Sequence, residues 1–408
     1  MGLIAWPVIL FRGLCNSTRC RFIVIAKTLY SSYLLENFTV AQTTTALQPQ
    51  RLLSLDFMRG FIMVLLMMES TALYVHLLKA TEGNFLNKFF LQFFHHDWNG
   101  LRFWDLIQPG FMYMAGVAMA YSLYKQEQSG LTWNQSFRKI LKRCGLLFFF
   151  GVLDYAVRPG GLSFELWDVL TQLSFTILVA FLIFRWQPGL QMVVCAGLLL
   201  LTEILYRFTD VPNFDQPFTD QHNFGNYMDL VLMNKINQGG WVAINCIPTA
   251  VHTIAGALTG KLLMSGRTDK IKQMILWGIA TLIAGYALDI FGITPIIKRI
   301  ATSSFTLASL GWCLLGLAFC YWWIDMRNHK KYLKFFIVVG MNSIFIYLFF
   351  EIVGNRWFSD YVRAIVNGLL GFIDTPILLS SIIASLCIFA LEWGLCYFLY
   401  TRKIFFKL

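Results

Sequence analysis

The sequence predicts an all-α fold, a polytopic helical bundle in a membrane with about ten transmembrane helices, within a range of about nine to eleven. Hydrophobic residues make up 57% of the 408 residues and charged residues only 13%, whereas soluble domains carry about 25% charged residues. Apolar runs of roughly bilayer-spanning length recur, and Lys and Arg cluster in the short loops between them. This composition excludes an ordinary soluble enzyme and a disordered chain.

The N-terminal residues 1–48 differ from the rest of the chain. Basic residues interrupt their apolar stretches, and a polar linker follows at 43–50. A signal peptide needs an unbroken apolar core and a small-residue cleavage site. We therefore expect a weakly structured extension, with an interfacial amphipathic helix as the alternative. Residues 49–408 form the second predicted domain, the transmembrane domain.

Ten apolar runs in this second domain are predicted to cross the membrane, because each has roughly the length required and is bounded by polar loops. They cover residues 54–78, 103–124, 140–157, 166–184, 188–206, 241–263, 272–291, 302–324, 335–353 and 376–400. Another apolar stretch at 364–373 is too short to cross, so we expect it to be re-entrant or interfacial.

The loop charges predict the orientation of the bundle. Basic clusters follow the second, sixth, eighth and tenth runs, whereas acidic residues collect in the loops on the opposite side. Lys-rich and Arg-rich short loops stay in the cytoplasm, so both termini are predicted to be cytoplasmic. The same loops account for the net charge of +11, and nucleic acid is not an expected partner.

Ionisable residues at membrane depth are expensive and therefore candidates for function. Asp56 and Arg59 lie three residues apart in the first run, on one helix face; they form either a structural ion pair or part of a binding site. Glu69 follows the apolar run 61–68 and needs a partner or a polar cavity. We expect it to bind substrate or cofactor, with a structural hydrogen bond as the alternative.

The loop between the first two runs contains His95, His96 and Asp97. Histidine exchanges protons near neutral pH, and a neighbouring carboxylate can fix the orientation of a histidine base. We interpret these three residues as catalytic candidates. A purely interfacial His and Trp cluster is the alternative. A metal site is not expected, because adjacent histidines do not have the spacing of zinc ligands, and none of the nine cysteines forms a CxxC motif.

Further polar residues occur within or beside later runs. Asp105 begins the second run, and Lys298 is a basic residue on the otherwise acidic side, which suggests an anionic partner. The other candidates for binding substrate or cofactor are Gln172, Ser303, Asn342 and Ser343. Ser and Thr in membrane helices often only bridge neighbouring helices, and that alternative applies to Ser303.

From about Gln50 to Leu408, the chain resembles the bacterial branch of the heparan-α-glucosaminide N-acetyltransferase family, within the transmembrane acyltransferase superfamily. The resemblance rests on four stretches and their order. They are RLLSLDFMRG at 51–60, HHDWNGLRFWDLIQP at 95–109, PIIK at 295–298 with TSSF at 302–305, and GMNS at 340–343.

The resemblance implies transfer of an acetyl group from cytoplasmic acetyl-CoA to a sugar or amino sugar on the far side of the membrane. The family's essential histidine maps to His95, with Trp98 and Asn99 in register, although His96 leaves the choice within the pair open. The family's Asp maps to Asp105, while Glu69 stands near the place of a family Asn. The resemblance also implies acetyl-CoA as donor substrate, a homodimer, and a multi-pass location in the bacterial inner membrane.

The expected mechanism has His95 acting as a general base or carrying the acetyl group itself, oriented by Asp97 or Asp105. Basic residues such as Arg59 would bind the CoA phosphates, and Glu69, Gln172 and Asn342 would line a polar passage. The alternative is a membrane transporter for N-acetylglucosamine or oligosaccharides. No inverted repeat and no pair of broken helices is visible in the sequence, which favours the enzyme.

Overall fold

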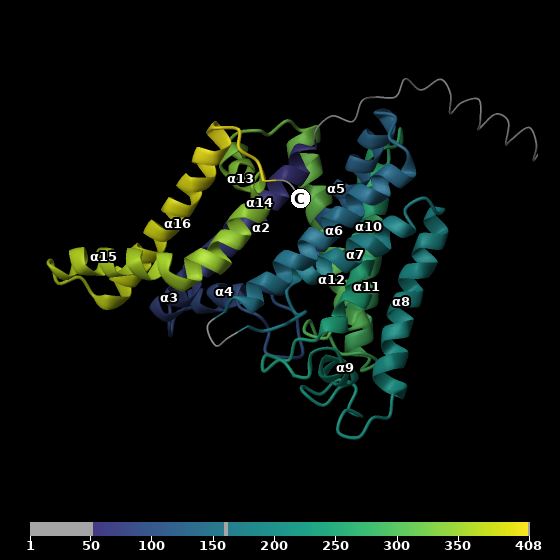
Figure 1. Cartoon of the computed structure of the whole chain (residues 1–408), viewed down its shortest axis with the longest axis horizontal. Helices are drawn as coiled ribbons and strands as arrows, with labels where there is room; N and C mark the ends of the chain where they lie inside the picture. The colour runs from purple at the N-terminus through teal and green to yellow at the C-terminus, as the bar shows by residue number, and fades with distance from the viewer. Residues whose placement is uncertain (1–51, 159–161, 407–408) are drawn as a thin grey trace, which may run out of the picture. The chain divides into compact units, whose positions relative to one another are not determined.

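The computed structural model describes residues 52–158 and 162–406, and the predicted extension 1–48 lies outside the described residues. The described part is all-helical, as predicted, and contains no strand, only an isolated bridge between Asn99 and Ile297. Figure 1 shows the elements, which in chain order are α2 (Leu53–Ser70), α3 (Leu73–Ala80), α4 (Leu86–Phe90), η1 (Leu91–Phe93), η2 (Phe103–Leu106), α5 (Ile107–Gln128), α6 (Trp133–Ala156), α7 (Val169–Leu182), α8 (Pro188–Phe208), α9 (Phe224–Met233), η3 (Ala243–Asn245), α10 (Cys246–Met264), α11 (Lys270–Ile290), α12 (Ser303–Cys320), η4 (Tyr321–Met326), α13 (Leu333–Gly340), α14 (Ser343–Phe349), η5 (Phe350–Phe358), α15 (Ser359–Gly371) and α16 (Ile377–Thr401).

Four helices of the described residues are long and apolar enough to cross a membrane: α8, α11, α12 continued by η4, and α16. Two bent pairs raise the number to six if each pair is one span. The other predicted spans are also helical, but they are shorter or more polar. The α7 helix has 14 residues, or about 21 Å at 1.5 Å per residue, against a hydrocarbon core of about 30 Å.

The first predicted span is broken into α2 and α3, which meet at 69°. Ala72 adopts the left-handed conformation with φ of 62°, and the carbonyl of Thr71 accepts hydrogen bonds from Ser385 at 2.7 Å and Arg363 at 3.3 Å. The ninth predicted span is likewise broken after α13, with a bend of 72°. The prediction that no pair of helices is broken is therefore wrong: the described residues contain two bent pairs, and α2 of one packs against α13 of the other.

Glycines allow the central helices to approach closely. A Cβ atom on Gly116 of α5 would lie 2.0 Å from the carbonyl oxygen of Thr253 on α10, and one on Gly256 would meet Tyr113 in the same way. Gly60 of α2 similarly packs on the backbone of Phe336 in α13. Such small residues let apolar helices pack backbone to backbone. These contacts hold α5 against α10 and α2 against α13, and the ends of α2 and α5 lie at the site described next.

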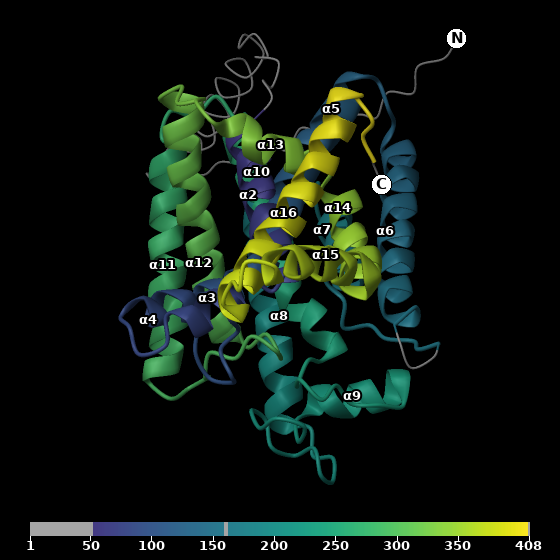
Figure 2. The same ribbon diagram turned by 90° about the vertical axis from the view of Figure 1, so that its left-hand side faces the viewer.

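The helices α11 and α12 lie side by side in both views (Figures 1 and 2), and α9 with its long flanking loops lies beside one end of α8. The bundle end reached by these loops also carries the segment 94–102 and the segment 291–302 between α11 and α12. The two segments are joined by the bridge of Asn99 with Ile297 and by a 2.8 Å hydrogen bond from the Gly100 amide to the Ile296 carbonyl.

Candidate active site

The segment 94–102 carries the two histidines and runs from η1 to η2. Gly100 sits at φ +143°, and a Cβ there would lie 2.5 Å from the His96 ring. Because only glycine fits this turn, the chain can bring the Asn99–Gly100 backbone against the Ile296–Ile297 backbone. The residue after Ile297 is Lys298, so this pairing carries Lys298 to His95.

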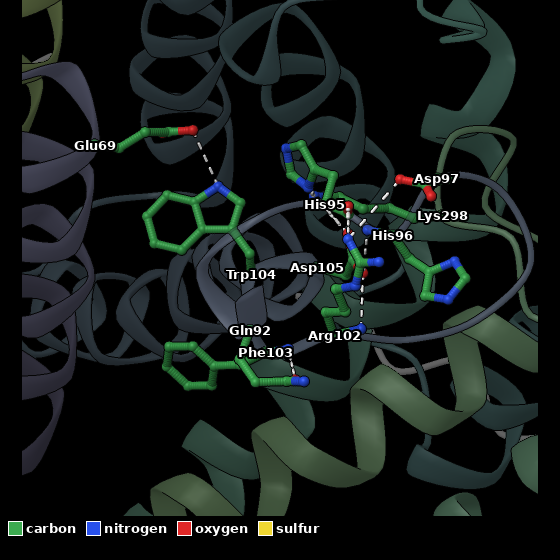
Figure 3. Close-up of polar contacts among 10 residues, drawn as sticks. All are labelled: Glu69, Gln92, His95, His96, Asp97, Arg102, Phe103, Trp104, Asp105 and Lys298. Atoms are coloured by element: carbon green, nitrogen blue, oxygen red, sulfur yellow. Dashed lines mark hydrogen bonds and ion pairs between the residues drawn. The ribbon is translucent and has the colours of Figure 1, made fainter. Parts of the chain in front are cut away.

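His95, Asp105 and Lys298 form a compact polar cluster (Figure 3). Nδ1 of His95 lies 3.0 Å from Oδ1 of Asp105 and 3.0 Å from Nζ of Lys298. The ammonium and the carboxylate are 3.7 Å apart. The side chains of Asp105 and Lys298 are 1% and 6% exposed, whereas that of His95 is 36% exposed. The histidine is therefore the accessible member of the cluster.

Asp105 is held by the backbone around it. Its Oδ2 accepts hydrogen bonds from the amides of His96 at 3.2 Å and Arg102 at 2.9 Å. Burial alone would raise the pKa of Asp105, but the hydrogen bond with His95 and the charge of Lys298 outweigh it, so the pKa falls below its usual range. Asp105 therefore stays a carboxylate and can orient the imidazole ring.

Burial and the charge of Lys298 lower the pKa of His95 to about 4, against the opposing influence of Asp105. His95 is consequently neutral at pH 7 and keeps one ring nitrogen free to accept a proton or attack an acyl group. Its Nδ1 faces the cluster, and Nε2 has no hydrogen-bond partner among the described residues. The Trp241 ring packs edge to face against the imidazole, with centroids 5.5 Å apart.

His96 and Asp97 do not face this cluster (Figure 3). The His96 ring packs on Gly100, and only its backbone contacts Asp105. The Asp97 side chain is 92% exposed and lies 3.9 Å from Arg102. Arg102 in turn donates a 2.6 Å hydrogen bond to the carbonyl of His95. Of the four predicted catalytic residues, the structure thus brings together His95 and Asp105.

Glu69 has a structural partner. Its Oε1 accepts a 3.1 Å hydrogen bond from Nε1 of Trp104, the residue before Asp105. Trp104 is 2% exposed, so this bond ties the end of α2 to η2 beside the cluster. The carboxylate of Glu69 also acts electrostatically on Lys298. The predicted partner of Glu69 is therefore a side chain of the chain itself.

Trp98 and Asn99 connect the loops that surround the site. Nε1 of Trp98 donates a 2.7 Å hydrogen bond to the carbonyl of Phe218, which lies in the loop between α8 and α9. Asn99 contributes the bridge to Ile297. These contacts join the loops before α5, after α8 and before α12 around His95.

A cavity of about 110 Å³ lies between α2, α5, α6, α7 and α14. Its lining is mostly apolar, with Arg59, Arg143, Ser343 and Tyr347 as the polar members. Nε of Arg143 is buried and has no hydrogen-bond partner among the described residues. An unsatisfied guanidinium nitrogen beside an apolar cavity suits an anionic group on an otherwise apolar ligand.

One face of α5 connects this cavity with the histidine cluster. Gln108, Phe111, Ala115 and Ala118 recur at helical spacing on it, and the last three line the cavity. Gln108 follows Asp105 by one turn. The face spans ten residues, about 15 Å at 1.5 Å per residue. On α2, which runs in the opposite direction to α5, Arg59 and Glu69 are also ten residues apart. Arg59, at the basic end of the cavity, therefore lies roughly 15 Å along the helix axis from Glu69, which is beside the His95–Asp105–Lys298 cluster.

The remaining predicted binding residues have structural contacts. Asp56 pairs with Arg59 at 3.4 Å, as expected. Gln172 is buried and bonds to Gln108 and to the carbonyl of Trp167. Ser303 bridges to the carbonyl of Leu199 at 3.4 Å, in agreement with the helix-bridging alternative.

Asn342 does not line the cavity. Its side chain donates to the carbonyl of Ile404 at 3.1 Å and accepts from the amide of Phe406 at 3.0 Å. Asn342 therefore binds the C-terminal segment through two hydrogen bonds, whereas its neighbour Ser343 lines the cavity.

Three residues near the two sites were not predicted from the sequence. Trp241 stands at the start of the sixth predicted run without a distinguishing local signal, and Arg102 lies inside the matched motif without a separate signal. Arg143 belongs to the basic cluster after the second run, which predicts only the orientation of the bundle. It shares a face of α6 with apolar Leu147, one turn away, and Phe150, two turns away, and a helical projection detects this pattern.

The described residues contain no group of three or more His, Cys, Asp or Glu side chains that could hold a metal ion. No protein-family model matches the chain, and a search of curated proteins finds no significant match.

Proposed function

We propose that the protein is a transmembrane acetyltransferase that moves the acetyl group of cytoplasmic acetyl-CoA to a sugar or amino sugar on the outer side of the inner membrane. The observation that carries this proposal is the single α5 face that links an arginine-bearing apolar cavity to the His95–Asp105–Lys298 cluster. A donor with an anionic head, a long flexible arm and a reactive thioester end matches that order.

The donor would enter at the basic end. Arg59 and Arg143 would bind CoA phosphates, and the apolar lining from α5 and α7 would cover the pantetheine arm. The cavity of about 110 Å³ holds only a few methylene groups, so the arm must displace flexible side chains such as Met63 and Met114. Met adapts readily in this way.

The reaction would take place at His95. As a general base, its free Nε2 removes the proton from the acceptor amine or hydroxyl while the acceptor attacks the thioester carbonyl, and the carbon–sulfur bond breaks to release CoA. As a nucleophile, Nε2 would first carry the acetyl group itself. Asp105 orients the ring in both routes. The nearby loops with Trp98 and Trp241 offer aromatic faces for a sugar ring.

The proposed topology has about ten spans, with α5, α6, α7 and α10 crossing in addition to the six candidates, and with both termini in the cytoplasm. The helices α5 and α10 would tolerate their polar residues because these face other helices rather than lipid. This topology would put Arg59 and Arg143 toward the cytoplasm and His95 toward the outside.

Donor binding is the first test. Purified protein should be stabilised against heat by acetyl-CoA, because a ligand present at about 100 times its Kd stabilises the folded state by about 2.7 kcal/mol. Arg143→Met removes a cavity-lining guanidinium, so this variant should need at least ten times more acetyl-CoA to reach the same thermal stabilisation. Lys142→Met is the matched control, because Lys142 is exposed on the same helix.

The two chemical routes are separated by incubating the protein with labelled acetyl-CoA, first alone and then with an amino sugar. Label on His95 before the amino sugar is added indicates the acetyl-histidine route. Label that is found only in the amino sugar after its addition indicates direct transfer. An absence of both acetyl-CoA stabilisation and acetyl transfer would overturn the proposed function.

One observation favours a second candidate, a sugar transporter. The two bent pairs, α2 with α3 and α13 with α14 to α15, pack against each other, and broken helices commonly form transport sites. A transporter would carry N-acetylglucosamine into proteoliposomes without acetyl-CoA, and His95→Ala would not stop the flux. An enzyme would show no such flux.

A further inference from the structure

Lys298 and Asp105 compete for the same nitrogen of His95. Nζ of Lys298 and Oδ1 of Asp105 are each 3.0 Å from Nδ1. A neutral imidazole nitrogen carries either a hydrogen or a lone pair, so Nδ1 donates to Asp105 or accepts from Lys298, but not both. A protonated Lys298 facing a protonated Nδ1 would set two donors against each other. The charge of Lys298 therefore determines which ring nitrogen of His95 bears the hydrogen.

Resting on the acetyl transfer proposed above, we propose that Lys298 is a positioning residue that acts through His95: it selects the reactive tautomer and takes up the proton that His95 removes from the acceptor. When Lys298 is neutral, Nδ1–H donates to Asp105 and Nε2 has its lone pair free. When Lys298 is protonated, it donates to Nδ1, the hydrogen moves to Nε2, and His95 cannot act as a base.

The proton movements balance over one turnover. Nε2 takes the proton of the acceptor, and Nδ1 passes its own proton to the neutral amine of Lys298, while the acceptor bonds to the acetyl carbon and the carbon–sulfur bond breaks. Lys298 is then an ammonium beside the Asp105 carboxylate. In the reset step Nε2 gives its proton to the CoA thiolate, and Nδ1 recovers one from Lys298. No imidazolium is needed, which agrees with a ring whose surroundings disfavour a charge.

The groups around Lys298 suit this role. Asp105 and Glu69 face it with negative charge, Arg299 with positive charge, and the Trp241 ring lies 5.2 Å from Nζ. Burial lowers the pKa of Lys298 to about 8, against the charges of Asp105 and Glu69. Arg299 also acts on His95, and Arg102 binds the His95 carbonyl. A lysine that loses its proton near pH 8 can alternate between the two states during turnover.

The test compares the pH profiles of kcat/KM for wild type, Lys298→Met and Lys298→Arg. Wild-type activity should rise with pH through about pH 8, as Lys298 becomes neutral. Lys298→Met has no donor that competes for Nδ1. It should therefore stay active, at a lower rate than wild type, and its activity should rise with pH at a lower pH than in wild type. Lys298→Arg stays protonated and always donates to Nδ1, so it should lose at least 100-fold at every pH. Near-normal activity of Lys298→Arg would overturn the inference, because it would mean that only a positive charge is required.

A second readout does not depend on acetyl transfer. Diethyl pyrocarbonate reacts with an unprotonated, accessible imidazole nitrogen, and its addition to His95 is measured by fragmentation mass spectrometry. Reaction should increase through about pH 8 in wild type, occur at lower pH in Lys298→Met and stay slow in Lys298→Arg. If His95 reacts equally with diethyl pyrocarbonate in all three folded proteins, the inference is contradicted. If the reaction follows the expected pH pattern but the protein transfers no acetyl group, only the proposed function is contradicted.

Discussion

Two adjacent histidines have different surroundings at the residue scale. The His95 ring contacts Asp105, Lys298 and Trp241, whereas the His96 ring packs on Gly100 and only its amide contacts Asp105. A change at the side chain of His96 leaves that amide in place. The sequence motif alone left the choice within the pair open, and the geometry favours His95.

This difference predicts unequal effects of the two alanine variants. His95→Ala should reduce the proposed acetyl transfer by about 10²–10⁴-fold, the usual contribution of a general base. His96→Ala should cost at most a few-fold. Initial rates of purified protein measure both effects, with thermal transitions as a folding control. A larger loss from His96→Ala would show that His96, and not His95, is the catalytic histidine.

Protonation of His95 also predicts a pH dependence of stability. Its pKa is about 4 in the folded protein and 6.5 in the ordinary case, so the unfolded chain binds the proton more tightly. Stability is then complete above pH 6.5 and decreases as the pH falls toward 4. The Tm of wild type should drop more between about pH 7 and pH 5 than that of His95→Gln. His96→Gln is the control and should behave like wild type; equal drops in all three proteins would refute the prediction.

The site residues that the sequence could predict are those marked by a motif or by an unexpected charge in the neighbouring sequence. Asp105 follows His95 by ten positions within one motif, and Lys298 was noticed because its charge lies on the wrong side. That these two share one nitrogen atom was not predictable, because His95 and Lys298 are 203 positions apart. Trp241 and Arg143 acquire their roles only through tertiary packing.

At the element scale, the contact between α5 and α10 depends on glycine. Gly116→Ala should destabilise the protein by about 1–3 kcal/mol, because the added methyl group meets the Thr253 carbonyl and forces the helices apart. Gly145→Ala on α6 is the matched control, since nothing lies within 4 Å of its Cβ position, and it should be neutral or slightly stabilising. Thermal unfolding in detergent measures both, and equal Tm values for the two variants would argue against close α5–α10 packing.

The helices themselves were largely predictable, because long apolar runs leave few alternatives in a membrane. The bends were not. The break at Ala72 contains neither proline nor glycine, and it is stabilised by Ser385 and Arg363, which lie about 300 positions away. A window of local sequence contains no information about those partners.

At the scale of the whole molecule, the proposed ten-span topology predicts which loops are reachable from outside the cell. Asp215→Cys, in the loop after α8, should react with a membrane-impermeant maleimide on intact cells. Arg267→Cys, in the loop after α10, should react only after the membrane is permeabilised. The parent protein controls for the native cysteines. Labelling of both sites from the same side would rule out this topology.

The pairing of Gly100 with Ile296 has a consequence for biosynthesis. His95 and Lys298 leave the ribosome 203 residues apart, which at about 5–20 residues per second is a delay of roughly 10–40 s. During that interval the His95 loop has Asp105 but lacks Lys298 and the backbone it docks on. A nascent chain stalled before residue 296 would therefore contain every helix from α2 to α11 and still lack an assembled site.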